Sequence, residues 1–365
     1  MTLAVNLAQG ASNNVTFRNR IINGNMVIDQ RNAGASVTPA NNAYTLDRWV
    51  VFTTQASKFT IQQNAGSVTT PAGFTKYLGI TSSSAYTVGA SDYFLLAQNI
   101  EGFNTQDLAW GTSSASPVTL SFRVYSSLTG TFGGSLWNYA GSGPSFPFTY
   151  TVSSANTWTT ISVTIIGPTT GSWNTTNSGS VVVGFGLGVG STNSNTANGT
   201  WYSSQYLGAT GATSVVGTSG ATFYITGVQL EAGTTASPFE YRQYGTELAL
   251  CQRYCWVYSG NSYAYARGPV LNVGTTSTIW YTQYPTTMRA APSLTANNIT
   301  SSTIEFSNYT NGSAPTYSSA IFNESSIWGG CVTLQTTGST FTAGGVGNWR
   351  WTGAPSANFT FSAEL

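Results

Sequence analysis

Only one short segment of this 365-residue chain carries a helix signal, and this scarcity constrains the fold more than any other feature. Residues 246–253, TELALCQR, combine good helix formers with Thr246 at the N-cap position and Glu247 near the positive end of the helix. Elsewhere, short runs of alternating apolar and polar residues are separated by Gly, Ser and Asn. This pattern predicts an all-β protein.

The predicted strands fall into two groups around that helix. Those before it cover residues 44–54, 58–63, 75–82, 93–100, 118–125, 146–152, 157–166, 181–189 and 223–230. Those after it cover residues 254–258, 262–266, 278–284, 293–296, 303–306, 326–334, 349–351 and 359–363. Two β-sandwich or jelly-roll domains joined by a connector with one short helix are therefore expected. The predicted limits are an N-terminal arm at 1–17, a jelly roll at 18–245 and a sandwich at 246–365.

Charged residues are rare, which narrows the classes of partner. They make up 6% of the chain, and residues 124–230 contain none. Aromatic residues reach 13%, so the composition is the opposite of a disordered one. A surface with so few charges repels its neighbours weakly, which favours a subunit of a fixed assembly. With two lysines, a net charge of +1 and no basic run, nucleic-acid binding is not expected.

Targeting signals are not evident in the sequence. No run of about 18 apolar residues occurs, so no membrane span is expected. The N-terminus lacks the basic region and long apolar core of a signal peptide, so synthesis in a bacterial cytoplasm is expected. Three cysteines are too few for a disulfide framework.

Catalytic and metal chemistry find little support. The chain has no His, which removes the usual catalytic triads and the commonest zinc ligand. Cys251 and Cys255 share one helix face, but Cys331 is the only further thiol, so buried structural cysteines are expected and no metal or cofactor. The carboxylates of Asp92, Glu101 and Asp107 are close in sequence and could form a glycosidase pair, although such a grouping arises easily by chance. The chain is therefore predicted not to be an enzyme.

Aromatic side chains are the better candidates for ligand binding, because sugar rings stack on them. The residues predicted to contact a glycan are Trp349, Trp351, Trp328, Trp280, Trp201 and Tyr202. Alternation puts Trp349 and Trp351 on one strand face, and the glycines just before them predict an exposed turn. The alternative for each ring is a place in a core or a subunit interface.

The Asp47-Arg48-Trp49 sequence is unusual in so uncharged a chain. It predicts a buried structural network with an ion pair and a cation–π contact, rather than a ligand site. Residues 181–189, VVVGFGLGV, carry Gly at alternate places. We expect that bare face to lie close to another backbone or to bend strongly.

Several motifs resemble those of bacteriophage virion appendage proteins, which include tail fibres, receptor-binding proteins and head-decoration proteins. They are INGNMVIDQRN, YTLDRW, ITGVQLEAGTTASPFEYRQYGTELALCQRY and the terminal FTFSAEL. The first domain is also similar to the carbohydrate-binding jelly rolls found beside glycosidases. Their last strand often carries an acidic pair where Thr226 and Gly227 stand here, which puts the calcium that such modules often hold in doubt.

The resemblance implies a non-enzymatic virion protein, a homotrimer, that attaches to host surface polysaccharide. Its other partners would be tail, baseplate or capsid proteins. The alternatives are a capsid decoration, cement or head-fibre protein that stabilises the shell, and a polysaccharide depolymerase. Each of these places the protein in the virion.

Overall fold

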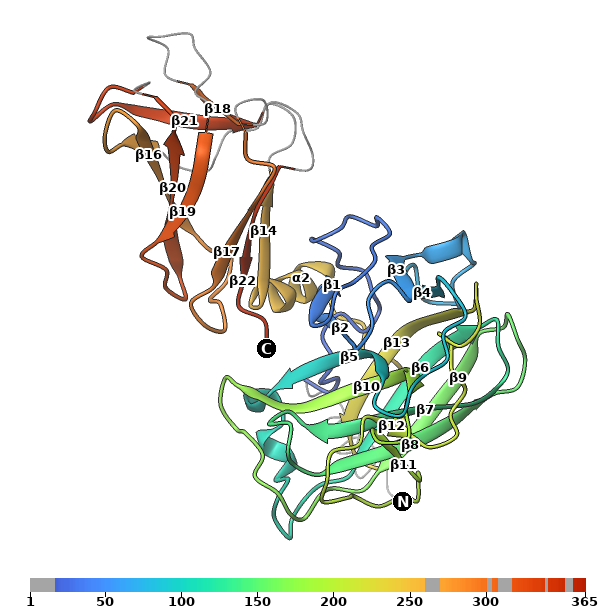
Figure 1. Cartoon of the computed structure of the whole chain (residues 1–365). Helices are drawn as coiled ribbons and strands as arrows, with labels where there is room; N and C mark the ends of the chain where they lie inside the picture. Colours follow the sequence, from blue (N-terminus) through green and yellow to red (C-terminus); the bar gives the residue numbers. More distant parts are fainter. Residues whose placement is uncertain (1–16, 260–269, 301–303, 308–316, 339–340, 352–356) are drawn as a thin grey trace. The chain divides into compact units, whose positions relative to one another are not determined.

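The computed structural model describes residues 17–259, 270–300, 304–307, 317–338, 341–351 and 357–365 (Figure 1). The chain divides into an N-terminal unit, Met1–Gln243 with Leu365, and a C-terminal unit, Tyr244–Glu364. The regular secondary structure of both units is almost entirely strand, which confirms the predicted all-β class. The predicted strand at 262–266 and residues 1–16 of the predicted arm lie outside the described residues.

The N-terminal unit contains two antiparallel sheets. The six-stranded sheet has the order β1-β2-β5-β10-β7-β8, with bounds Ala43–Leu46, Trp49–Thr53, Tyr93–Glu101, Gly179–Val189, Gly130–Asn138 and Ser145–Val152. The five-stranded sheet has the order β3-β4-β13-β6-β9, with bounds Phe59–Gln63, Leu78–Ser82, Thr222–Ala232, Val118–Ser126 and Thr159–Ile165. A short parallel pair joins β11, Ser194–Asn195, to β12, Gly208–Ala209. Three 3₁₀ turns connect strands at Ala65–Ser67, Gly102–Asn104 and Gln106–Leu108.

The core of this unit forms between the two sheets. Alternate side chains of β6, Leu120, Phe122 and Val124, are buried there, as strand geometry requires. The Phe122 ring lies 5.0 Å, centroid to centroid, from Phe185 of β10 and from Tyr150 of β8. Rings from both sheets therefore meet in one layer, so the unit is a β-sandwich.

The predicted single strand over residues 44–54 is wrong, because the chain makes a hairpin there. In the antiparallel pair β1–β2, Leu46 lies opposite Trp49, and Asp47 and Arg48 form the turn. Arg48 has a φ of 70°, in the left-handed region. Tight hairpin turns usually satisfy that requirement with Asn or Gly. An Arg in this role carries no turn signal, so the alternating pattern continues across the hairpin.

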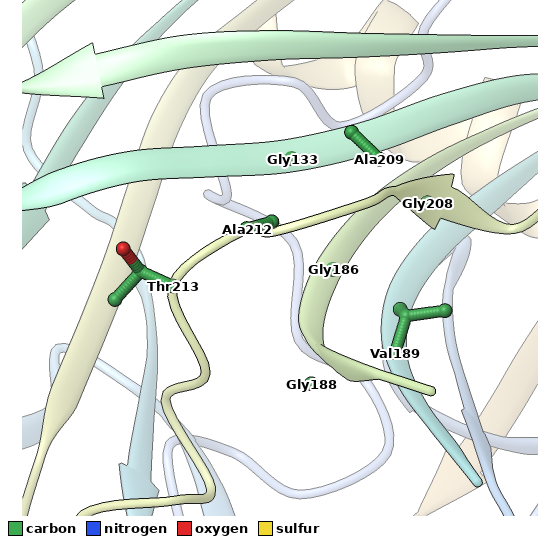
Figure 2. Close-up of a pocket in the computed structure, with 8 residues that line it drawn as sticks. All are labelled: Gly133, Gly186, Gly188, Val189, Gly208, Ala209, Ala212 and Thr213. Carbon is green, nitrogen blue, oxygen red and sulfur yellow. The ribbon is translucent and has the colours of Figure 1, made fainter. Parts of the chain in front are cut away.

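The glycine face of β10 lies close to neighbouring backbone at Gly186, as predicted, but to side chains at Gly184 and Gly188. A Cβ atom on Gly186 would lie 3.0 Å from the carbonyl oxygen of Gly133 on β7, and one on Gly188 would lie 2.8 Å from a methyl carbon of Val216. Figure 2 shows the crevice between these glycines and the segment of Gly208. Its volume is about 10 Å³, which is water-sized.

A set of hydrogen bonds, here called the clasp, ties the start of the described chain to the connector after β13. The Glu240 carboxylate accepts from the backbone N–H of Asn19 at 2.7 Å, and the Glu240 N–H donates to Gln229 Oε1 at 2.8 Å. Arg242 Nη1 donates to the carbonyl oxygen of Ile21 at 3.1 Å. The connector motif therefore has a structural role within the N-terminal unit.

The C-terminal unit also contains two sheets. The three-stranded sheet has the order β14-β22-β17, with bounds Cys255–Ser259, Asn358–Ser362 and Ser293–Asn297. The six-stranded sheet has the order β18-β21-β15-β16-β20-β19, with bounds Ile304–Ser307, Val346–Trp351, Val270–Asn272, Ser277–Gln283, Gly329–Thr336 and Tyr317–Asn323. Their buried side chains form one core, which includes Trp256, Trp280, Trp349, Trp351 and Phe359.

The helix α2, Tyr244–Gln252, begins two residues before the predicted N-cap, so Thr246 lies within the helix. Cys251, near its end, is buried, as are Cys255 and Cys331. Among the described residues, no helix is long and apolar enough to cross a membrane.

Candidate functional site

A concave site lies on the face of the five-stranded sheet that points away from the sandwich core. Leu120, Phe122 and Val124 point inward from β6, so Ser121 and Arg123 point outward. The register with β9 puts Ser121 opposite Ser162 and Arg123 opposite Thr160. The floor of the site therefore consists of hydroxyl groups around one guanidinium. Arg123 Nη1 donates a hydrogen bond to Thr160 Oγ1.

Three aromatic rings form a wall beside this floor. The Phe74 ring lies 5.2 Å from Phe239 and 5.6 Å from Tyr241, and the last two rings are 4.9 Å apart. Phe239 and Tyr241 follow β13 in the connector, and Tyr241 is 57% exposed. Gly227 allows this packing, because its φ is 62° and a Cβ atom there would lie 2.6 Å from the Phe74 ring.

The floor and the Phe74 and Phe239 rings of the wall enclose a groove of about 340 Å³, within the range of about 300–1,000 Å³ typical of ligand pockets, and Tyr241 packs against both rings beside the groove. It is lined by Phe74, Ser121, Phe122, Arg123, Thr160, Ile161, Ser162, Gly227, Ala236, Ser237, Pro238 and Phe239. Burial raises the pKa of the nearby Tyr241 hydroxyl, and the positive charge of Arg123 acts in the opposite direction. The groove offers ring faces and hydroxyl partners, but its lining contains no carboxyl group. It is therefore suited to binding a polar ring compound.

More aromatic rings continue along the same sheet face. Tyr125 lies two residues beyond Arg123 on β6 and stacks on Tyr224 of β13 at 5.4 Å, with the ring planes 5° apart. Tyr77 stacks on the same Tyr224 at 5.1 Å, and Trp158 lies 5.5 Å from Tyr125. Tyr125 and Trp158 are half-buried, so part of each ring remains accessible beside the groove.

The structure does not place the predicted glycan-contacting tryptophans Trp280, Trp349 and Trp351 at an exposed rim. All three are completely buried in the core of the C-terminal unit. The Trp349 ring lies 5.9 Å from Trp280 and 5.8 Å from Phe359. A ring enclosed in this way cannot stack on a sugar, so the prediction is wrong for these three residues. Their shared strand face was inferred correctly, but it is the inward one.

The other three predicted residues differ in exposure. Trp328 is 67% exposed, so a ligand role for it stays a prediction. Trp201 is half-buried, its ring lies 5.5 Å from Trp173, and its Nε1 donates to the Ile166 carbonyl oxygen at 2.6 Å. Tyr202 is half-buried too, and its hydroxyl donates to the carbonyl oxygen of Thr196 at 2.9 Å. None of the three lines the groove.

Asp47, Arg48 and Trp49 are buried, as a structural network requires. The Asp47 carboxylate accepts from the backbone N–H and the side-chain amide of Gln30, at 2.7 and 2.6 Å. Arg48 Nη2 donates to the carbonyl oxygen of Asn99 at 2.6 Å. The Trp49 indole N–H is also hydrogen-bonded to backbone. The ion pair and the cation–π contact within this triplet stay predictions.

The three acids considered for hydrolysis, Asp92, Glu101 and Asp107, are held by structural contacts or buried. Asp107 forms a two-point ion pair with Arg20, at 2.6 and 2.9 Å, and Glu101 is buried in β5. Hydrogen bonds lower the pKa of Asp92, with the largest effect from the Tyr86 hydroxyl and a smaller one from the Thr54 hydroxyl. That direction is the opposite of what a general acid needs.

The described part of the chain contains no group of three or more His, Cys, Asp or Glu side chains placed to bind one metal ion. At the place of the acidic pair in similar jelly rolls, Thr226 is fully buried, and its hydroxyl donates to the carbonyl oxygen of Lys76.

A second surface is the outward side of the six-stranded sheet in the C-terminal unit. Register places five neighbours from five strands in one nearly apolar row: Val346, Leu271, Ile279, Thr333 and Ile321. Tyr281, two residues beyond Ile279, is 57% exposed. The strands β15, β16, β19 and β20 contain no charged residue. We call the outward side of these four strands, together with Val346 of the neighbouring β21, the neutral face.

Comparisons with known proteins give weak likenesses. No protein-family model and no curated protein matches the chain. Matching solved structures include the enzymatically active domain of tailspike protein 4 from bacteriophage CBA120, with 11% identity and a TM-score of 0.33 over 60% of this chain but 22% of the tailspike chain. A CBM4 structure matches with 16% identity and a TM-score of 0.30 over 58% of this chain and 98% of its own.

A family 11 carbohydrate-binding module from Clostridium thermocellum, in complex with a mixed-linked tetrasaccharide, matches with 11% identity and a TM-score of 0.27. That match covers 56% of this chain and 99% of the module. With TM-scores this low, the likenesses do not assign a function to the chain.

Proposed function

We propose that the chain binds glycans without catalysis, through the groove on the five-stranded sheet of the N-terminal unit. The observation that carries this proposal is the combination of an aromatic wall with a hydroxyl floor in one cavity of about 340 Å³. A sugar ring presents apolar C–H faces and a rim of hydroxyl groups, so it matches both surfaces. The lining contains no carboxylate pair for hydrolysis, which favours binding over cleavage.

The exposed ring of Tyr241 is the natural platform for stacking. Its ring packs against Phe74 and Phe239, and these contacts restrict its rotamers, so less side-chain freedom is lost when a ligand binds. Ser121, Thr160 and Ser162 supply hydroxyl donors and acceptors below it. The stacked rings around Tyr224 would extend the contact for a polymer longer than the groove.

Replacing the platform tests the proposal. Tyr241→Ala should weaken the binding of soluble host-envelope oligosaccharides at least about tenfold, because it removes the exposed ring. Calorimetry on the full chain measures this effect. Tyr244→Ala is the matched control, since Tyr244 is a similarly exposed tyrosine, at 63%, outside the groove. Equal affinities for wild type and Tyr241→Ala would refute the groove as the glycan site.

We further propose that this glycan binding serves a bacteriophage virion, as a homotrimeric tail-fibre or receptor-binding subunit made in the bacterial cytoplasm. The support is the motif resemblance together with the low charge of the chain. Each groove would bind weakly, and several copies on one particle would act together. Labelling intact particles with an antibody to this chain tests the location. Particles that carry no label would refute the virion role.

A further inference from the structure

The groove contains one charge, and its own lining leaves that charge unbalanced. Arg123 is the only charged residue among those that line it. It is also the only charged residue of the sequence between Asp107 and Glu231. No acidic residue therefore lies within 15 residues of Arg123 in the sequence. The cross-strand neighbour of Arg123 on β9 is the neutral hydroxyl residue Thr160.

Other arginines of the N-terminal unit differ from Arg123. Three of them form ion pairs, namely Arg18 with Glu231, Arg20 with Asp107 and Arg242 with Glu240. Within the described residues, the hydrogen-bond partner recorded for the Arg123 guanidinium is the neutral hydroxyl of Thr160. Arg123 is half-exposed in the groove, so its remaining N–H donors can meet a ligand.

The position of this guanidinium relative to the aromatic wall matters as much as its charge. Arg123 is close enough to the Tyr241 hydroxyl for its charge to act on that group. Tyr241 in turn packs edge-to-face against Phe239, which lines the groove. A ring compound seated on the wall would therefore present a substituent to Arg123.

We propose that the groove selects sugars that carry a carboxylate, and that Arg123 binds this carboxylate. This inference rests on the proposed glycan-binding function. A guanidinium offers a planar fork of donors that matches the two oxygens of a carboxylate. The low charge of the surrounding surface leaves few competing partners, because the chain carries eleven acids in 365 residues. A sulfate group is also anionic, but it is tetrahedral and not planar. The test below therefore compares carboxylated with sulfated polymers.

The test uses the full chain and matched polymers. Immobilised polygalacturonate, alginate and hyaluronan are each compared with the same polymer after reduction of its carboxylates to alcohols, and sulfated dextran is the anionic control. The variants are Arg123→Gln, which keeps hydrogen-bonding groups but loses the charge, and Lys58→Gln, which removes one positive charge outside the groove lining. Tyr241→Ala reports whether the groove is used at all.

We expect at least one uronate polymer to bind, with affinity falling about tenfold or more on carboxylate reduction and equally in Arg123→Gln. Lys58→Gln should bind like the wild type. If reduced and native polymers bind alike and only Tyr241→Ala weakens binding, glycan binding in the groove stands and carboxylate selection is refuted. Tighter binding to sulfated dextran than to every uronate polymer also refutes it. If no polymer binds, or Tyr241→Ala changes nothing, the groove proposal itself fails.

Discussion

Tyr150 shows how one polar atom can act against the packing around it. Its ring packs between the sheets against Phe122 and Phe132, at centroid distances of 5.0 and 5.8 Å. Its hydroxyl is buried and finds no hydrogen-bond partner among the described residues. Burial raises the pKa of this hydroxyl far above its ordinary value of 10. An unsatisfied hydroxyl in such a place costs about 1–3 kcal/mol.

Removing that hydroxyl should therefore stabilise the folded protein. We expect Tyr150→Phe to raise the free energy of unfolding by about 1 kcal/mol at pH 7, measured by denaturant unfolding. Above about pH 10, an unfolded tyrosine ionises while the buried one does not, so the wild type loses about 1.4 kcal/mol of stability per pH unit from this residue. Tyr150→Phe should lose less over the same alkaline range. A variant less stable than the wild type at pH 7 would show that the hydroxyl has a partner.

Residue identity explains why the predicted aromatic rim failed. Alternation fixes that Trp349 and Trp351 share a face, but it does not say which face is buried. The charged Arg350 between them favours the opposite face as the solvent side, and that signal was outweighed by the glycines before Trp349. Arg123 is a second signal of this kind. A single charge in a long uncharged stretch could have indicated the groove, although its partners Phe74 and Phe239 lie too far away in sequence to be recognised beside it.

Among the structural elements, the irregularity in β13 at Gly227 shapes the groove. Its pairing with β6 shifts between Thr226 and Gln229, and Gly227 lies inside that shift with a positive φ. The missing side chain leaves room for the Phe74 ring, which in turn supports the aromatic wall. One backbone feature thus couples strand geometry to the site.

Gly227→Ala should cost about 1–2 kcal/mol of stability from the left-handed backbone alone, and more because its methyl group displaces Phe74. Gly211→Ala is the matched control, because Gly211 has a φ of 77° and nothing lies within 4 Å of its missing Cβ. Thermal unfolding of both variants separates backbone strain from collision. Equal losses would mean that Phe74 adjusts freely and that the wall does not depend on Gly227.

At this scale, the sequence predicted much of the structure. Alternation in β-branched runs such as residues 157–166 located strands within a few residues. It missed β15 and β19 in the C-terminal unit, and it failed at two further places for which the structure gives a reason. The turn at Asp47 and Arg48 uses a left-handed Arg, which has no turn signature. The strand β7 begins GTFGG, whose glycines are typical of loops but here allow close packing against Ala209 and Ala212.

For the whole molecule, the neutral face is the surface that we expect to join copies of the chain. Its five strands β21, β15, β16, β20 and β19 lie about 4.8 Å apart and rise about 3.3 Å per residue, which gives roughly 400 Å² of flat area. Side chains standing on it add more, so two such faces approach the area of about 1,000 Å² of a specific interface. The strands β15, β16, β20 and β19 carry no charged residue, so an uncharged surface of another copy would leave no charge unpaired there, which favours a copy of the same chain as the occupant.

Charge placed on this face should separate the copies. We expect Tyr281→Lys with Val346→Lys to shift the purified chain from an oligomer to a monomer at micromolar concentration in light scattering, because lysines brought together repel and lose hydration. Phe103→Lys is the control, since Phe103 is 49% exposed in the N-terminal unit. A wild-type chain that is monomeric, or a double variant that remains oligomeric, would refute this interface.

The clasp has a consequence for how the protein is made. Its hydrogen bonds join residues 221 apart in sequence, from Asn19 to Glu240 and from Ile21 to Arg242. At a translation rate of about 5–20 residues per second, roughly 10–45 s pass between synthesis of the first partner and synthesis of the second. Throughout that interval, Asn19 and Ile21 lack their hydrogen-bond partners Glu240 and Arg242. The N-terminal unit therefore closes late on the ribosome, after β13 and its connector have emerged.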